Sequence, residues 1–178
     1  MLRNLLIASS IAAVASVADA HTMMAVPQPS YPPGFYQGMY PVMRINTDNL
    51  APEIPWYLGV QKITAVMKNQ KDLRSFIMNN AVVNKTLGSW ATKECGFSLA
   101  DGVKQPLPAA VDFPWGHAGP CEIWCDNTKV FYNGDCQGNN VGKVSLAGKC
   151  NGAKRIQAMY VGTHLAPWEV YMQCAPIA

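Results

Sequence analysis

The sequence predicts a mainly β protein: an antiparallel, immunoglobulin-like β-sandwich with long loops, one or two short helices and disulfide staples. Three observations lead to this fold class. Short segments of alternating apolar and polar residues lie in the second half of the chain, 14 glycines and 13 prolines supply turns, and six cysteines offer cross-links. Short strands that are separated by turn residues are typical of sandwiches.

The strand signals are strongest after residue 120. Cys121–Cys125 and Lys129–Tyr132 flank the turn-forming triplet Asp126-Asn127-Thr128, which predicts a hairpin. Arg155–Val161 and Trp168–Cys174 alternate in polarity and predict two further strands. On the last strand, one face carries Val170, Met172 and Cys174, and the other carries Glu169, Tyr171 and Gln173.

The first half of the chain predicts loop and one helix. Residues 22–57 are rich in proline and aromatic residues, a composition that favours a long, folded-back loop. Between Gln70 and Val82, apolar residues recur at helical spacing after Asp72, an acid near the start of a helix. We therefore expect a short helix in this segment.

The N-terminal segment has the pattern of a secretory signal. Arg3 precedes an apolar run from Leu5 to Val17, and Ala18-Asp19-Ala20 fits the small-residue rule of signal peptidase. We expect residues 1–20 to be a signal peptide and residues 21–178 to be one catalytic domain. The apolar run is too short for a membrane span, so we expect a secreted, extracellular protein without membrane association.

The cysteines agree with export. All six lie after the predicted signal, and an even number in an oxidising compartment predicts disulfides, whose pairing the residues alone leave open: Cys95, Cys121, Cys125, Cys136, Cys150 and Cys174. Asn84-Lys85-Thr86 is a possible glycosylation triplet. We expect a monomer.

The charge is mild, with a formal net charge of +3 and a pI of about 8.5. The longest basic run is Lys154-Arg155, so the sequence does not favour nucleic acid as a partner. An anionic polysaccharide is compatible with this balance. No pair of acidic residues forms a recognisable hydrolase motif.

Histidine occurs three times, and one occurrence would become the first residue after signal cleavage. As an N-terminal residue, His21 offers its α-amine and its ring Nδ1 to one metal ion. A second imidazole would complete a three-nitrogen site, which suits copper(II). The sequence therefore predicts one copper ion per chain, with its affinity falling in acid as the amine and imidazole take up protons.

Two further motifs carry a family resemblance. Gly116-His117-Ala118-Gly119-Pro120 resembles the segment that supplies the second copper histidine in fungal cellulose-active lytic polysaccharide monooxygenases. Glu169-Val170-Tyr171-Met172-Gln173-Cys174 resembles the last strand of those enzymes. His164 resembles their second-sphere histidine, although its spacing to Glu169 is shorter. The resemblance implies His21, His117 and Tyr171 around the metal, with His164, Glu169 and Tyr171 in catalytic positions.

The small size, the start at His21 and the Tyr/Pro-rich first loop resemble most closely the oomycete pectin-cleaving members, auxiliary-activity family seventeen. That resemblance implies oxidative cleavage of homogalacturonan with an external small-molecule reductant and O2 or H2O2 as co-substrate. By resemblance to the fungal enzymes, it also implies a disulfide between Cys95 and Cys174.

Other interpretations of the same residues remain open. His117 has the alternative of a buried, hydrogen-bonded histidine, Tyr171 that of a packing residue, and His164 with Glu169 that of a surface pair. Met23 and Met24 offer soft copper contacts or fill gaps. Four aromatic residues either stack on sugars or pack the first loop onto the sandwich: Tyr31, Phe35, Tyr36 and Tyr40.

Two other functions are compatible with the sequence. One is a non-catalytic copper-binding protein that uses the same pair of histidines for metal acquisition or delivery. The other is a disulfide-rich secreted binding module or effector in which the histidines are incidental. The first predicts copper without oxidised sugars, and the second predicts no stoichiometric copper.

Overall fold

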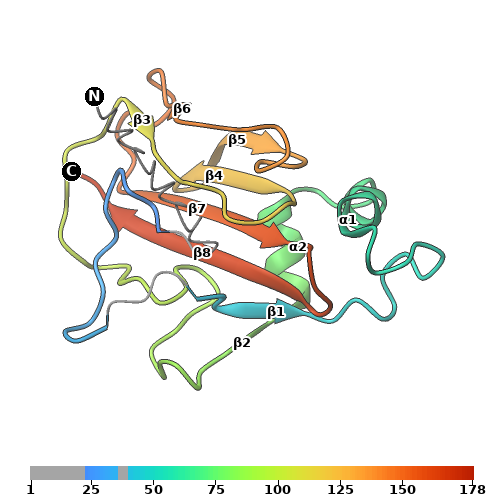
Figure 1. The fold of residues 1–178 in the computed structure, drawn as a ribbon. Coiled ribbons are helices and arrows are strands. Elements are labelled where there is room, and N and C mark those ends of the chain that lie inside the picture. Colours follow the sequence, from blue (N-terminus) through green and yellow to red (C-terminus); the bar gives the residue numbers. More distant parts are fainter. Residues whose placement is uncertain (1–22, 36–39) are drawn as a thin grey trace, which may run out of the picture.

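The computed structural model describes residues 23–35 and 40–178, and these residues form two antiparallel sheets and two short helices (Figure 1). The predicted signal peptide, His21 and Tyr36 lie outside the described residues. The larger sheet has six strands in the order β2-β1-β8-β7-β4-β5, and β3 pairs with β6 in a separate two-stranded sheet. The elements are β1 (Met43–Ile45), α1 (Gly59–Met67), α2 (Leu73–Asn80), β2 (Ala81–Val83), β3 (Ala110–Val111), β4 (Cys121–Cys125), β5 (Thr128–Asn133), β6 (Val144–Ser145), β7 (Arg155–Gly162) and β8 (Trp168–Pro176).

The predicted fold class is confirmed: the chain is mainly β, its sheets are antiparallel, its helices are short, and disulfides tie it together. The larger sheet is covered on both faces. Ile156, Ala158 and Tyr160 of β7 pack on the side of the small sheet, and its neighbours Met159 and Val161 pack on the side of α2. Every residue of β8 is buried for this reason, including the polar ones.

Helix α2 lies within the predicted helical segment. The side chain of Asp72 accepts a hydrogen bond from the backbone N–H of Ser75, which is the geometry of an N-cap. Burial alone would raise the pKa of Asp72, but the hydrogen bonds from Ser75 and two nearby lysines outweigh it and lower that pKa. The helix ends at Asn80 rather than at Val82, because the following residues pair with β1 as strand β2.

The proline-rich first segment is less irregular than its composition predicts. Strand β1 lies within it, between β2 and β8, and its register places Arg44 opposite Glu169. Tyr31 and Phe35 pack against the core on the α2 side, where Phe35 meets Trp90 edge to face with ring centroids 5.0 Å apart. For these two aromatic residues, the packing interpretation is the one that the structure supports.

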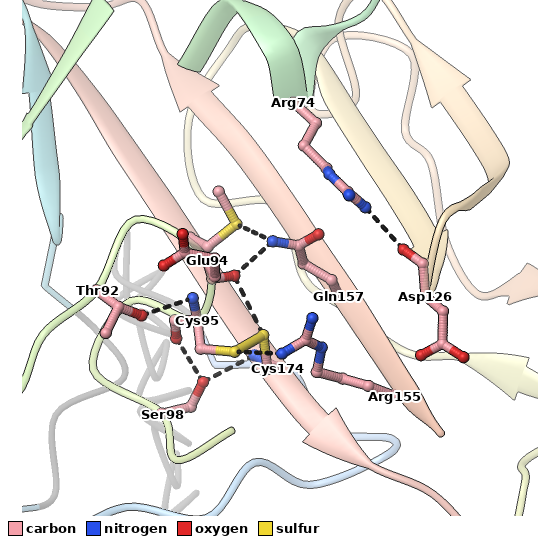
Figure 2. The surroundings of a disulfide bond; sticks show 10 residues. Arg74, Thr92, Glu94, Cys95, Ser98, Asp126, Arg155, Gln157 and Cys174 are labelled. Carbon is pink, nitrogen blue, oxygen red and sulfur yellow. Dashed lines mark hydrogen bonds between the residues drawn. A yellow bond between two sulfur atoms is a disulfide. The ribbon is translucent and has the colours of Figure 1, made fainter. Parts of the chain in front are cut away.

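Three disulfides link the described part of the chain, and the pairing of Cys95 with Cys174 is confirmed. Its Cα atoms are 4.9 Å apart, and those of Cys121–Cys136 and Cys125–Cys150 are 5.9 and 5.4 Å apart, all within the usual range. Figure 2 shows the segment around Cys95 beside β8, where the backbone N–H of Cys174 donates to Ser98 Oγ at 2.7 Å.

Three disulfides are typical of an oxidising, extracellular environment. Neither helix in the described part of the chain is long and apolar enough to cross a membrane.

Candidate metal centre

The candidate site lies at one end of the large sheet, where segments far apart in the sequence meet. The loop that leads into β4 carries His117, and the loop that joins β7 to β8 carries His164; both loops and α1 lie at the same end of the sheet (Figure 1). Strand β8 adds Glu169 and Tyr171. One potential ligand atom from each of His117, His164 and Glu169 lies within 4.8 Å of the others. The structure thus brings together four of the five predicted site residues.

The two imidazoles are stacked rather than edge to edge. Their ring centroids are 3.8 Å apart and their planes differ by 17°. Gly162 makes room for this arrangement, since a Cβ there would lie 3.2 Å from His117 Cβ and 3.3 Å from His164 Nδ1. An imidazole nitrogen binds a metal ion in the plane of its ring. Because near-parallel planes at this distance share no such point, one ion can take an in-plane nitrogen from only one of the two rings.

The backbone of the His117 loop is fixed by contacts with β7 and with the segment after β5. Thr163 donates to the carbonyl of Ala118 through both its backbone N–H and its hydroxyl, each at 2.9 Å. The N–H of Gly119 donates to Asp135 Oδ1 at 3.0 Å. Gly119 has φ +140°, and a Cβ at this position would lie 2.0 Å from the carbonyl oxygen of Val161. The loop therefore requires glycine here.

Glu169 is nearly buried, and three side chains surround its carboxylate. Oε1 accepts from Arg44 Nη2 at 3.0 Å, and Oε2 accepts from the hydroxyl of Tyr171 at 2.8 Å. His164 Nε2 lies 3.7 Å from Oε2. The side chain of Glu169 is 8% exposed and that of His164 is 33% exposed. This geometry differs from a solvated surface pair, because the carboxylate is held from the protein side while the histidine reaches the surface.

Tyr171 lies in the core beside His117. It stacks on Tyr160 with ring centroids 4.4 Å apart and planes within 3°, and its ring centroid is 5.8 Å from that of His117. Burial raises the pKa of Tyr171 far above its usual value, and Tyr160 and Glu169 add to the rise. The side chain is therefore a neutral phenol whose hydroxyl donates a hydrogen bond to Glu169.

The first described residues run beside the same strand. Met24 is fully buried in the core on the Tyr171 side, so its side chain fills space there. Its backbone N–H donates to Gln173 Oε1 at 2.7 Å, and Gln173 lies on the same strand face as Tyr171. Met23 is partly exposed. The chain directly after residues 21 and 22 is thereby anchored to the strand that carries half of the candidate site.

Two surface features adjoin the site. A recess of about 370 Å³ is lined by Arg44, Asn46, Thr47, Asp48, Val82, Ala166 and Pro167. Trp56 and Tyr57 are 55% and 68% exposed and contact each other edge to face. They precede Leu58, the N-cap of α1, and the first residue of this helix, Gly59, packs against Thr163, the neighbour of His164. Tyr40 is also exposed.

Sequence reasoning missed Arg44 and Tyr160 as members of the site. Arg44 belongs to a three-residue strand inside a segment whose composition predicts a loop. The pairing of Arg44 with Glu169 therefore could not be predicted from the sequence. Tyr160 had one: it alternates with Ile156 and Ala158 on one face of a predicted strand. A comparison with known protein families finds no matching family model, and a comparison with curated proteins finds no match.

Proposed function

We propose that the protein is a secreted, copper-dependent lytic polysaccharide monooxygenase, an oxidoreductase that cleaves plant cell-wall polysaccharide oxidatively, with the homogalacturonan of pectin as its substrate. The observation that carries the proposal is the convergence of His117, His164, Glu169 and Tyr171 at one end of the sheet. Three separate segments contribute these residues, and the two sequence motifs that resemble the family contain three of the four.

The donor set fits copper. Imidazole nitrogens suit this metal, and an N-terminal amine with a second histidine would complete a three-nitrogen set. Two imidazoles and a carboxylate are also the set that binds non-haem iron. The near-parallel rings of His117 and His164 argue against joint binding of one ion by both. We assign His117 as the ligand and His164 as its stacking neighbour.

The anchor at Met24 is compatible with a contribution from His21. Three residues of extended chain span at most about 10 Å, and two residues along a strand span roughly 6.6 Å. A histidine three residues before Met24 therefore has the reach to meet a site close to Tyr171, two residues from the Gln173 contact.

Bound copper would supply one-electron chemistry with an external reductant and O2 or H2O2. His117 would hold the ion, and Tyr171, packed against Tyr160, would separate it from the core. Glu169 is held in one orientation by Arg44 and Tyr171, so its carboxylate is placed to orient or exchange a proton beside the site. His164 is the partly exposed member that substrate and solvent reach.

The test uses processed protein that begins at His21, titrated with copper and then incubated with ascorbate and homogalacturonan. We expect one copper ion per chain and oxidised oligogalacturonides by mass spectrometry, with both lost in His117→Ala. A matched control carries one extra alanine before His21, which leaves every side chain intact but converts the amine into an amide. It should weaken copper binding strongly.

The rival functions give different results in this experiment. Tight stoichiometric copper without oxidation of pectin or another glycan would replace the proposal with a copper-binding protein for acquisition or delivery. No stoichiometric copper in the processed protein would favour a disulfide-rich binding module or effector.

A further inference from the structure

The recess beside the candidate site has the composition of a sugar-binding pocket. Its volume of about 370 Å³ is within the range of small-molecule sites. Val82, which is 73% exposed, forms an apolar part of the wall together with Ala166 and Pro167. Arg44, Asn46 and the other polar residues form the rest. Apolar surface matches the C–H face of a sugar ring, and polar groups match its hydroxyls.

The recess and the candidate site share one side chain. Arg44 lines the recess and donates to Glu169 through Nη2 at 3.0 Å. Ala166 and Pro167 belong to the loop between His164 and Glu169. A sugar unit in the recess would therefore lie next to the residues around the metal, on the side of β1.

Arg44 supplies the positive charge of this recess. Its side chain is 46% exposed, and it is the only cation that lines the recess in the described part of the chain. A guanidinium carries five donors in a planar fork, so one hydrogen bond to Glu169 leaves the group able to bind a second carboxylate. Asp48, also in the wall, is an acceptor for sugar hydroxyls.

We infer that this recess is a subsite for one uronate unit of the polysaccharide and that Arg44 binds the carboxylate of that unit. The inference rests on the proposed function for the identity of the ligand as a polysaccharide. Beyond the proposed function, the inference assigns the recess as the place where the protein distinguishes a carboxylated sugar from a neutral one.

The experiment measures binding of a short oligogalacturonide and of a neutral cello-oligosaccharide to the processed protein by calorimetry, without reductant, so that no turnover occurs. Arg44→Gln should weaken binding of the oligogalacturonide at least tenfold, which is the loss of a hydrogen bond between charged groups. Its control is Arg155→Gln, the same change at the start of β7. This position is at the opposite end of the strand from Gly162, which lies beside the two histidines.

Because Arg44 also holds Glu169, a second variant leaves both residues in place. Val82→Glu adds a negative charge to the rim of the recess, and Val103→Glu adds the same charge at an equally exposed position, 72% against 73%, outside it. Val82→Glu should reduce binding of the oligogalacturonide at least fivefold, and Val103→Glu should leave it unchanged within twofold. Neither variant should change binding of the neutral cello-oligosaccharide.

Equal effects of the paired variants would overturn the inference, as would equal binding of the charged and neutral ligands to the unaltered protein. Either result would leave the proposed function untouched if copper-dependent oxidation persists. Conversely, a protein that binds no copper but shows the expected Arg44 and Val82 effects would refute the proposed oxidation and retain the uronate subsite.

Discussion

Removal of a single oxygen atom tests the network around Glu169. In Tyr171→Phe the ring can keep its stack on Tyr160, since the centroids are 4.4 Å apart and the hydroxyl takes no part in that contact. The side chain is only 1% exposed, so water cannot readily replace the lost donor. What disappears is the 2.8 Å hydrogen bond to the carboxylate of Glu169.

The expected cost follows from that bond. Hydrogen bonds to charged groups contribute about 1.5–3 kcal/mol, and Glu169 retains Arg44 on its other oxygen. We therefore expect a loss of about 2 kcal/mol in the free energy of unfolding at neutral pH. For a domain of this size, that corresponds to a fall in Tm of about 4–8 °C.

The assay is thermal and urea unfolding of the metal-free processed protein, with Tyr57→Phe as the matched control. Tyr57 is 68% exposed, and its contact with Trp56 is made by the ring, so its change should stay within about 0.5 kcal/mol. Copper affinity should change less than threefold, because a neutral phenol is a weak ligand. If Tyr171→Phe is as stable as Tyr57→Phe, the assignment of this hydrogen bond as a stabilising link is wrong.

Three further changes probe other parts of the molecule. Asp72→Ala should lower the free energy of unfolding by about 1 kcal/mol at pH 7, measured by urea unfolding. Because the pKa of Asp72 is lowered in the fold, this loss should persist above about pH 4 and shrink as the pH falls through the folded-state pKa. A loss that does not change with pH would contradict the cap. Joint replacement of Cys95 and Cys174 by alanine opens a loop with a sequence separation of 79 and should cost about 4.5 kcal/mol in unfolding free energy, whereas an unchanged midpoint would argue against the cross-link. Trp56→Ala should weaken polysaccharide binding about fivefold, from the loss of roughly 1 kcal/mol of aromatic contact, and leave copper affinity unchanged in the same titration.

Local signals in the sequence predict some elements and miss others for physical reasons. Helix α2 was predictable because its cap and its apolar spacing are both local. Helix α1 was missed because its N-cap is Leu58, without a capping side chain, and its buried positions include Gly59 and Lys62. The amine of Lys62 is satisfied by the carbonyl groups of Ala51 and Ile54, partners that no periodicity can foresee.

The residues of the candidate site likewise fall into some that the sequence predicts and some that it does not. His117, Glu169 and Tyr171 lie in short motifs that can be read along the chain, and the structure brings them together. Arg44 was invisible, since its importance depends on the pairing of β1 with β8 and on the recess beside it. The stack of the imidazoles likewise depends on Gly162, a residue that has no chemistry of its own.

Within the pentapeptide Gly116–Pro120, the structural role of Gly119 is separate from the chemical role proposed for His117. Its backbone passes so close to the carbonyl of Val161 that no other residue fits, whatever stands at position 117. A chain without any metal site would still need this glycine to close the loop on β7. The glycine of the motif thus reflects the course of the backbone, whereas the histidine carries the chemistry that we propose. In comparisons with other chains, a match at Gly119 should therefore count as a sign of shared architecture, and a metal site should be inferred only from His117 together with Glu169.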